Sequence, residues 1–197
     1  MNDSISIFEV EVKLPLHDVK AIESVLTDLG AKRTNSEKQI DVYLDHPCKS
    51  FGETDEALRL RTRKNIVVDS PDANDIPDTE IEMTYKGPKI DATTKTRIEL
   101  SVGVDNLEVA KALLLNLGFK DVATITKNRI FYVHKGITVS IDDIQDIGTY
   151  LELERVVNSE ELIHDARKEI FQLIESMGLN PNDSIRESYL EIYLKNQ

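Results

Sequence analysis

The feature that most constrains the fold is an alternation of charged and apolar residues that recurs in short segments along the chain. In the first of these segments, residues 8–13, three apolar side chains alternate with Glu9, Glu11 and Lys13. Successive side chains of a strand point to opposite faces, so this pattern predicts a strand with one apolar face and one ionic face. A single strand of this kind is typical of any half-buried sheet. Its repetition is what constrains the fold.

Eight segments carry this or a closely similar pattern: residues 8–13, 39–45, 57–63, 80–86, 96–102, 125–133, 138–142 and 150–154. Three other segments have apolar residues at helical spacing, namely residues 19–29, 107–117 and 159–177, and each is followed by a glycine that can end a helix. A short amphipathic segment, residues 188–194, closes the chain. Many strands and few helices predict an α+β fold in which an eight-stranded antiparallel β-barrel carries helices on its outside.

We expect a single domain over residues 1–197, because a chain of this length can bury one sizeable core. Residues 65–79 contain two prolines and four aspartates and show little periodicity. A connection of this length and composition predicts a mobile acidic loop.

Which strand face points into the barrel decides the function class. If the apolar face points inward, side chains fill the barrel and the charges are surface charges. If the ionic face points inward, the amphipathic helices can pack on the apolar outer face, and the barrel becomes a charged tunnel. The need of the helices for an apolar partner favours the tunnel.

The charges on the polar faces are sorted by sign, which also favours the tunnel. Acidic residues gather near the two ends of the chain, at Glu9, Glu11, Asp142, Glu152 and Glu154, and basic residues lie between them, at Arg59, Arg61, Arg63, Lys86, Arg97, Lys127 and Arg129. Carboxylate oxygens are the ligands that Mg²⁺ prefers, and guanidinium groups bind phosphate oxygens bidentately. The pattern therefore indicates a metal-bound polyphosphate in an enclosed cavity, with ordinary surface charge as the alternative.

Composition narrows the partners and the location. The chain has 24 basic and 36 acidic residues, a net charge of −12, which argues against a general nucleic-acid binder. No apolar run approaches the roughly 18 residues of a membrane span, and residues 1–4 lack the features of a signal peptide, so we expect a cytoplasmic protein without a membrane anchor. The single cysteine, Cys48, excludes an internal disulfide framework. Leucine-rich surfaces on the terminal helices could support a homodimer.

Residues 9–13, Glu-Val-Glu-Val-Lys, resemble the ExExK signature of the CYTH superfamily, the triphosphate tunnel metalloenzymes. Further motifs follow in family order at residues 39–43, 56–61, 84–89, 94–99, 141–143 and 148–154, and residues 187–191 resemble the end of the class IV adenylate cyclase-like branch, as in archaeal members. The resemblance covers nearly the whole chain. The long insertion at residues 65–79 departs from compact members.

The resemblance implies a tunnel that holds a triphosphate and a divalent cation, Mg²⁺ or Mn²⁺. The metal ligands would be Glu9, Glu11, Asp142, Glu152 and Glu154, and the phosphate-binding residues would be Lys13, Arg59, Arg61, Lys86, Arg97, Lys127 and Arg129. Lys13 and Tyr43 match positions that take part in catalysis in some members of the family.

The cyclase-like motifs predict a Mg²⁺-dependent adenylate cyclase that converts ATP to cyclic AMP and pyrophosphate. The alternative is a triphosphatase that hydrolyses inorganic triphosphate, thiamine triphosphate or a nucleoside triphosphate, since nearly all of the site residues would be shared. A third reading is a non-catalytic polyphosphate sensor, against which the paired carboxylates argue.

Overall fold

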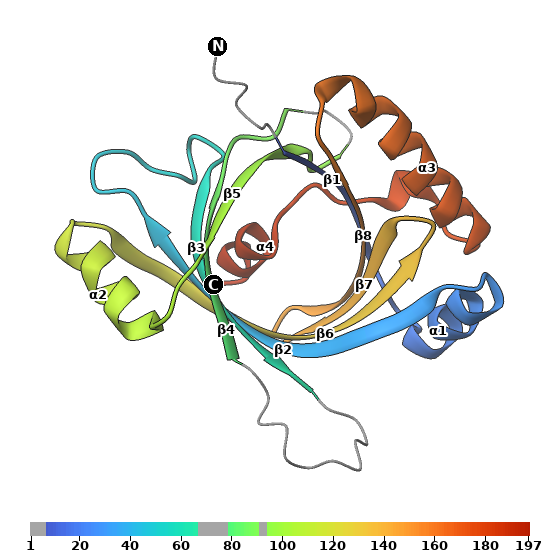
Figure 1. Cartoon of the computed structure of the whole chain (residues 1–197), viewed down its shortest axis with the longest axis horizontal. Helices are drawn as coiled ribbons and strands as arrows, with labels where there is room; N and C mark the ends of the chain where they lie inside the picture. Colours follow the sequence, from blue (N-terminus) through green and yellow to red (C-terminus); the bar gives the residue numbers. More distant parts are fainter. Residues whose placement is uncertain (1–6, 67–78, 91–93) are drawn as a thin grey trace.

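In the computed structural model, which describes residues 7–66, 79–90 and 94–197, eight strands close into a barrel (Figure 1). The strands are β1 (Phe8–Pro15), β2 (Lys32–Asp45), β3 (Ala57–Asn65), β4 (Thr79–Lys86), β5 (Arg97–Gly103), β6 (Lys120–His134), β7 (Ile137–Ile144) and β8 (Gly148–Val157). Their order around the barrel is β1-β5-β4-β3-β2-β6-β7-β8, and every neighbouring pair is antiparallel. The predicted eight-stranded antiparallel barrel is confirmed.

Strands β2 and β6 are longer than their alternating cores predict. They pair from Lys32 opposite Val133 to Asp45 opposite Lys120, with register shifts between Arg33 and Asn35 and between Tyr43 and Leu44. The polar start of β2, residues 32–38, has no clear alternation, so its sequence alone does not indicate a strand. Pairing with β6 extends it.

Three helices cover the apolar outer face of the barrel (Figure 1): α1 (Val19–Asp28) and α3 (Ile163–Ser176) lie on one side, and α2 (Leu107–Asn116) lies on the opposite side. Helices α1 and α3 pack on outward-facing residues of β1, β7 and β8, of which Val10, Val139, Leu151 and Leu153 have no exposed surface. Helix α2 packs with its Leu114 on β2 and β3. The apolar strand faces thus point outward under the helices, as the tunnel hypothesis requires.

Helix ends follow local sequence signals. Asp18 and Asn106 cap α1 and α2, each with a side-chain oxygen that accepts a hydrogen bond of 3.0 Å from a backbone N–H of the first turn. Helix α2 stops at Gly118, which has a φ of +94°, a conformation that favours glycine. The chain then turns directly into β6.

The last helix, α4 (Tyr189–Lys195), differs from the other three in its location. Figure 1 shows it within the outline of the barrel, and its residues line the same cavity as the charged strand faces. A capping box between Ser188 and Glu191 starts the helix and directs Tyr189 into the barrel wall, where it is 6% exposed.

Two further predictions from the sequence concern a loop and the absence of membrane spans. The predicted loop at residues 65–79 falls mostly on residues 67–78, which lie outside the described residues. Among the helices of the described ranges, none is both long and apolar enough to cross a membrane.

Candidate active site

The ionic strand faces enclose a cavity of about 640 Å³ inside the barrel. Every strand contributes to its lining: Glu9 and Glu11 from β1, Gln39 and Tyr43 from β2, Arg59, Arg61 and Arg63 from β3, Glu82 and Lys86 from β4, Arg97 and Glu99 from β5, Lys127 and Arg129 from β6, Thr138 from β7, and Glu152 and Glu154 from β8. The structure thus brings together in one cavity all the predicted site residues except Lys13 and Asp142.

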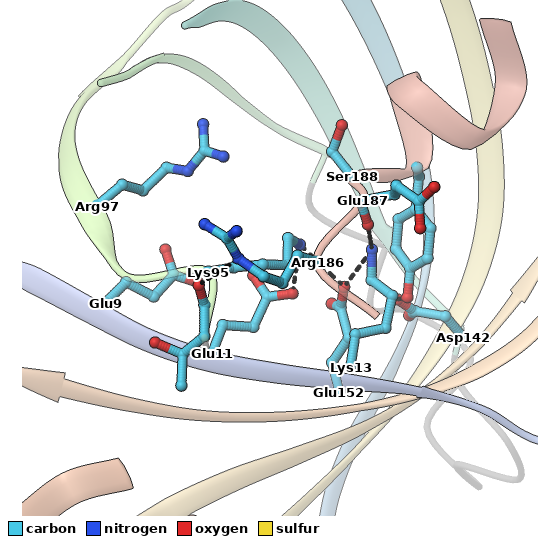
Figure 2. Close-up of polar contacts among 12 residues, drawn as sticks. Glu9, Glu11, Lys13, Lys95, Arg97, Asp142, Glu152, Arg186, Glu187 and Ser188 are labelled. Carbon is cyan, nitrogen blue, oxygen red and sulfur yellow. Dashed lines mark hydrogen bonds and ion pairs between the residues drawn. The ribbon is translucent and has the colours of Figure 1, made fainter. Parts of the chain in front are cut away.

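Lys13 and Asp142 lie in the wall of the barrel behind the ring of Tyr189. The Lys13 ammonium sits 3.6 Å from the centre of that ring and donates a hydrogen bond of 2.9 Å to the backbone carbonyl of Glu187 (Figure 2). The Tyr189 hydroxyl donates a hydrogen bond of 2.8 Å to Asp142 Oδ2. Both residues are 0% exposed, so α4 separates them from the open cavity.

Two of the predicted metal ligands, Glu11 and Glu152, face one lysine ammonium. Lys95 Nζ lies 2.5 Å from Glu11 Oε1 and 3.8 Å from Glu152 Oε1 (Figure 2). Burial raises the pKa of Glu11, and the neighbouring Glu152 carboxylate raises it further. Burial acts on Glu152 in the same direction, but Arg129, Lys13 and Lys95 outweigh it and hold the pKa of Glu152 well below its usual range.

Arg129 joins Glu152 to Asp142. Its guanidinium donates two hydrogen bonds to Asp142, one of them 2.5 Å from Nε to Oδ1, and a third to Glu152 Oε2. Asp142 is also 3.6 Å from the ammonium of Lys127. One guanidinium therefore fixes two of the predicted metal ligands in place.

Glu9 and Glu154 stand further along the tunnel. Burial raises the pKa of Glu9 well above its ordinary value; Lys86 opposes the shift and the Glu154 carboxylate adds to it. Glu9 Oε2 is 4.0 Å from Lys86 Nζ, which also forms a close ion pair with Glu99. These carboxylates are only partly neutralised by basic side chains.

The basic wall contains both paired and unpaired groups. Arg61 donates from Nε and an NH2 group to the two oxygens of Asp41, at 2.6 and 2.7 Å. Arg97 donates to the backbone carbonyl of Gly87 at 3.1 Å. Within the part of the chain that the structure describes, Arg59 Nε and Gln39 Oε1 are buried without a hydrogen-bond partner. Such groups are costly to bury unless a ligand satisfies them.

The pKa values of three buried residues bear on proton transfer. Burial, aided by Lys95, lowers the pKa of Lys13 to about 7. Burial, aided by Arg129, lowers the pKa of Lys127 to about 7. Burial and the Asp41 carboxylate raise the pKa of Tyr43 to about 12, so its hydroxyl stays protonated near neutral pH and can donate a hydrogen bond.

Three residues of the site escaped the sequence analysis. Asp41 lies two residues before Tyr43, and Lys95 lies two residues before Arg97. Strict alternation of strand faces would therefore have placed both on the ionic face. Tyr189 carried no such signal, because it lies in the short amphipathic segment of residues 188–194, outside the eight alternating segments. The sorting of charges is also less complete than the sequence suggested, since Glu82 and Glu99 line the cavity among the cations and Asp41 pairs with Arg61 in the barrel wall.

Replacing Asp41 with asparagine should lower the free energy of unfolding by about 3–5 kcal/mol at pH 7, because it leaves the buried Arg61 guanidinium unpaired. Burial alone would raise the pKa of Asp41, but Arg61 outweighs it and holds the pKa well below its usual range. A depressed carboxyl pKa contributes stability that is present above about pH 4 and is lost as the pH falls further. Urea unfolding from pH 7 to pH 3 should therefore show that the difference from wild type shrinks below about pH 4.

The control for this variant is Asp143→Asn, which changes an exposed carboxylate on the outer face of β7. It should stay within about 0.5 kcal/mol of wild type. A difference for Asp41→Asn that does not change with pH would contradict the assigned role of its pair with Arg61.

The donor chemistry of the acidic wall fits a hard divalent cation. In the described ranges, no three His, Cys, Asp or Glu side chains are already arranged as a metal site. However, Glu11 and Glu152 face each other closely enough to share one ammonium, and carboxylate oxygens suit Mg²⁺ or Mn²⁺. A cation position between two carboxylates therefore exists, and the Lys95 ammonium lies in it.

Known proteins resemble this chain over most of its length. The CYTH domain family model matches residues 8–189. MJ0240 of Methanocaldococcus jannaschii, provisionally named an adenylate cyclase, is 34% identical over 184 residues, which cover 93% of this chain and 97% of that protein. Adenylate cyclase CyaB of Aeromonas hydrophila is 28% identical over 183 residues, 92% of this chain and 86% of that protein. The structure of PH1819 from Pyrococcus horikoshii OT3 superposes with a TM-score of 0.84 at 32% identity, covering 96% of this chain and 99% of the other.

Proposed function

This chain belongs to the CYTH family of metal-dependent triphosphate tunnel enzymes, and on that premise we propose that it is a class IV adenylate cyclase-like enzyme that converts ATP to cyclic AMP and pyrophosphate. The observation that carries the proposal is the cavity, in which a basic wall from β3 to β6 faces an acidic wall from β1 and β8. A volume of about 640 Å³ lies in the range of pockets for ligands of nucleotide size.

In this proposal the triphosphate of ATP lies along the basic wall. Arg59 and Arg97 would bind phosphate oxygens directly, because both line the cavity and Arg59 Nε is buried without a partner among the described residues. Arg61, Lys86, Lys127 and Arg129 would complete the wall. Charges preorganised in this way stabilise the negative charge that develops on the phosphate and on the leaving pyrophosphate.

The acidic wall would hold the divalent cation. Glu11 and Glu152 are its central ligands in this proposal, with Glu9 and Glu154 beside them in the cavity. Asp142, which was predicted as a ligand, lies behind Tyr189 and would act through Arg129. When bound, the cation supplies Lewis-acid stabilisation of phosphate charge. Arg129 positions Glu152 for that role, because its guanidinium bonds Glu152 and is itself held by Asp142.

The ribose 3′-hydroxyl would attack the α-phosphate in line, forming the cyclic diester while the bond to pyrophosphate breaks. We assign Tyr43 to donate a hydrogen bond inside the tunnel, since its hydroxyl stays protonated. Lys13 is assigned to hold the Glu152 carboxylate, 3.5 Å from its ammonium. The role of Lys13 in this proposal differs from the phosphate-binding and catalytic role that the family resemblance implies, because its ammonium lies behind Tyr189 and does not line the open cavity.

A triphosphatase is the second candidate function. A protein of the same fold, described as a putative adenylyl cyclase from Hippeastrum with a dominant triphosphatase activity, has a TM-score of 0.66 at 13% identity. The same tunnel residues would then bind inorganic triphosphate or an organic triphosphate, and water would attack the terminal phosphate. The two functions differ in what surrounds the far end of the substrate.

Product analysis of the purified protein separates the two functions. The protein is given ATP and, separately, inorganic triphosphate with Mg²⁺ or Mn²⁺, and the products are resolved chromatographically. Cyclic AMP together with pyrophosphate supports the cyclase. Phosphate release without cyclic AMP supports the triphosphatase, and turnover that persists in excess chelator contradicts the metal dependence of both.

A further inference from the structure

Lys95 is bound to Glu11 through both its backbone and its side chain. Its backbone N–H donates a hydrogen bond of 3.0 Å to the Glu11 carbonyl, and its ammonium lies 2.5 Å from Glu11 Oε1. The same ammonium reaches to 3.8 Å from Glu152 Oε1. Figure 2 shows its side chain close to those of Glu11 and Glu152. Its side chain is buried, with 9% of its surface exposed.

An ammonium and a divalent cation cannot share this place. Mg²⁺ binds oxygen ligands at about 2.0–2.1 Å, so an ion placed between Glu11 and Glu152 would compete with Lys95 for Glu11 Oε1. A positive charge a few ångströms from a divalent ion also repels it strongly in a partly desolvated tunnel. Metal bound by Glu11 and Glu152 therefore requires the Lys95 ammonium to move away.

The other two basic residues that form ion pairs with Glu152, Lys13 and Arg129, are also held by other groups. Lys13 donates to the carbonyl of Glu187 and lies over the ring of Tyr189, outside the open cavity. Arg129 is bound to Asp142 by two hydrogen bonds. Lys95 lines the cavity through which a cation would enter, and its ion pairs are with Glu11 and Glu152 themselves. It is the cation best placed to be exchanged.

We propose that Lys95 is a resident counter-ion that occupies the metal position in the metal-free enzyme, and that its displacement sets the affinity of the tunnel for divalent cations. The inference rests on the proposed metal site of Glu11 and Glu152. In this proposal Lys95 controls how tightly the metal binds, and binding of phosphate is not its role before the metal enters.

The exchange also links the metal to the triphosphate. Lys95 and Arg97 line the same cavity, so an ammonium displaced from Glu11 would remain beside the proposed phosphate-binding wall. A triphosphate that enters the cavity can form an ion pair with the displaced Lys95 ammonium. Metal entry thus frees one further cation for the substrate, and by thermodynamic reciprocity the substrate should favour metal entry.

The test is a calorimetric titration of the metal-free full-length chain with Mn²⁺ alone. Lys95→Met should bind Mn²⁺ about tenfold more tightly than wild type or better, because the competing charge is gone. Lys95→Arg keeps a counter-ion and should bind Mn²⁺ no more tightly than wild type. The matched control is Lys111→Met, which removes the same kind of side chain from an ion pair of 3.0 Å with Asp121 outside the tunnel and should leave the affinity unchanged.

Thermal unfolding of the same variants keeps the proposal testable if Lys95→Met is poorly folded. Without metal, Lys95→Met and the milder Lys95→Gln should be less stable than wild type, because two buried carboxylates lose a counter-ion. Saturating Mn²⁺ should then raise their melting temperatures more than that of wild type.

Unchanged or weaker Mn²⁺ affinity in Lys95→Met and Lys95→Gln, with wild type binding normally, would overturn the role of Lys95 and leave the proposed function standing. Absence of Mn²⁺ binding in wild type and in both variants would overturn the metal site itself. Binding in the variants but not in wild type would support the counter-ion role in its strongest form.

Discussion

Glu152→Gln is expected to reduce metal-dependent turnover by about 10³-fold or more while the barrel stays folded. Glu152 is the carboxylate on which Lys13, Lys95 and Arg129 converge. Glutamine keeps the shape of the side chain and removes the charge that would hold the cation, whose contribution to such reactions amounts to several kcal/mol. The measurement is the steady-state rate with saturating Mg²⁺ or Mn²⁺, on ATP and on inorganic triphosphate.

The fold should survive this substitution because the neighbours of Glu152 keep other partners. Arg129 retains Asp142, and Lys95 retains Glu11. Circular dichroism and a melting curve establish that the variant is folded, and Glu175→Gln, at an exposed position of α3, serves as the matched control. Turnover within a few-fold of wild type in a folded Glu152→Gln variant would eliminate the acidic metal site. Glu11→Gln should behave in the same way.

Arg129→Met is expected to give the largest combined loss, in stability and in activity. The substitution leaves Asp142 and Glu152 without the guanidinium that bonds both, and removing one partner of a buried ion pair costs about 3–5 kcal/mol. It also removes a cation from the proposed phosphate-binding wall. Urea unfolding measures the first effect, and the rate on ATP at saturating metal measures the second.

Arg129→Lys separates the charge of this residue from its geometry. Lysine restores a positive charge but not the bidentate fork, so its stability and activity should fall between those of Arg129→Met and wild type. The outer-face control is Arg155→Met, which breaks a partly exposed ion pair with Glu169 and should cost at most about 1 kcal/mol. Equal effects of Arg129→Met and Arg155→Met on unfolding would show that the Asp142–Arg129–Glu152 network does not stabilise the barrel.

A divalent cation should partly rescue the stability of Arg129→Met. Without the guanidinium, the carboxylates of Asp142 and Glu152 repel each other, and a bound cation can neutralise them. The increase in melting temperature on adding Mg²⁺ should therefore be larger for Arg129→Met than for wild type. A smaller increase would indicate that Arg129 is needed to hold these carboxylates in a metal-binding arrangement.

Local sequence patterns determined a large part of this protein. The alternation in residues 8–13 and 57–63 defined strands with two chemically different faces, and the glycines at positions 30, 118 and 178 marked the ends of helices. Strand periodicity and helix termini are short-range properties, since steric and hydrogen-bond preferences of adjacent residues decide them. The eight strands, the three outer helices and the residues of the ionic faces could therefore be predicted.

Closure of the barrel decided which strand face points inward and which distant residues meet, and local sequence patterns could not decide either. Only the pairing of β1 with β5 and β8 turns the ionic faces inward, since either face of an amphipathic strand can be buried until the whole sheet closes. Closure also places Lys95 against Glu11, from which it is 84 residues distant, and Tyr189 against Asp142, 47 residues distant. Contacts of such separation depend on the path of the whole chain. Residue type alone identified the carboxylates and cations, but only the tertiary structure decided which cation stands where the metal would bind.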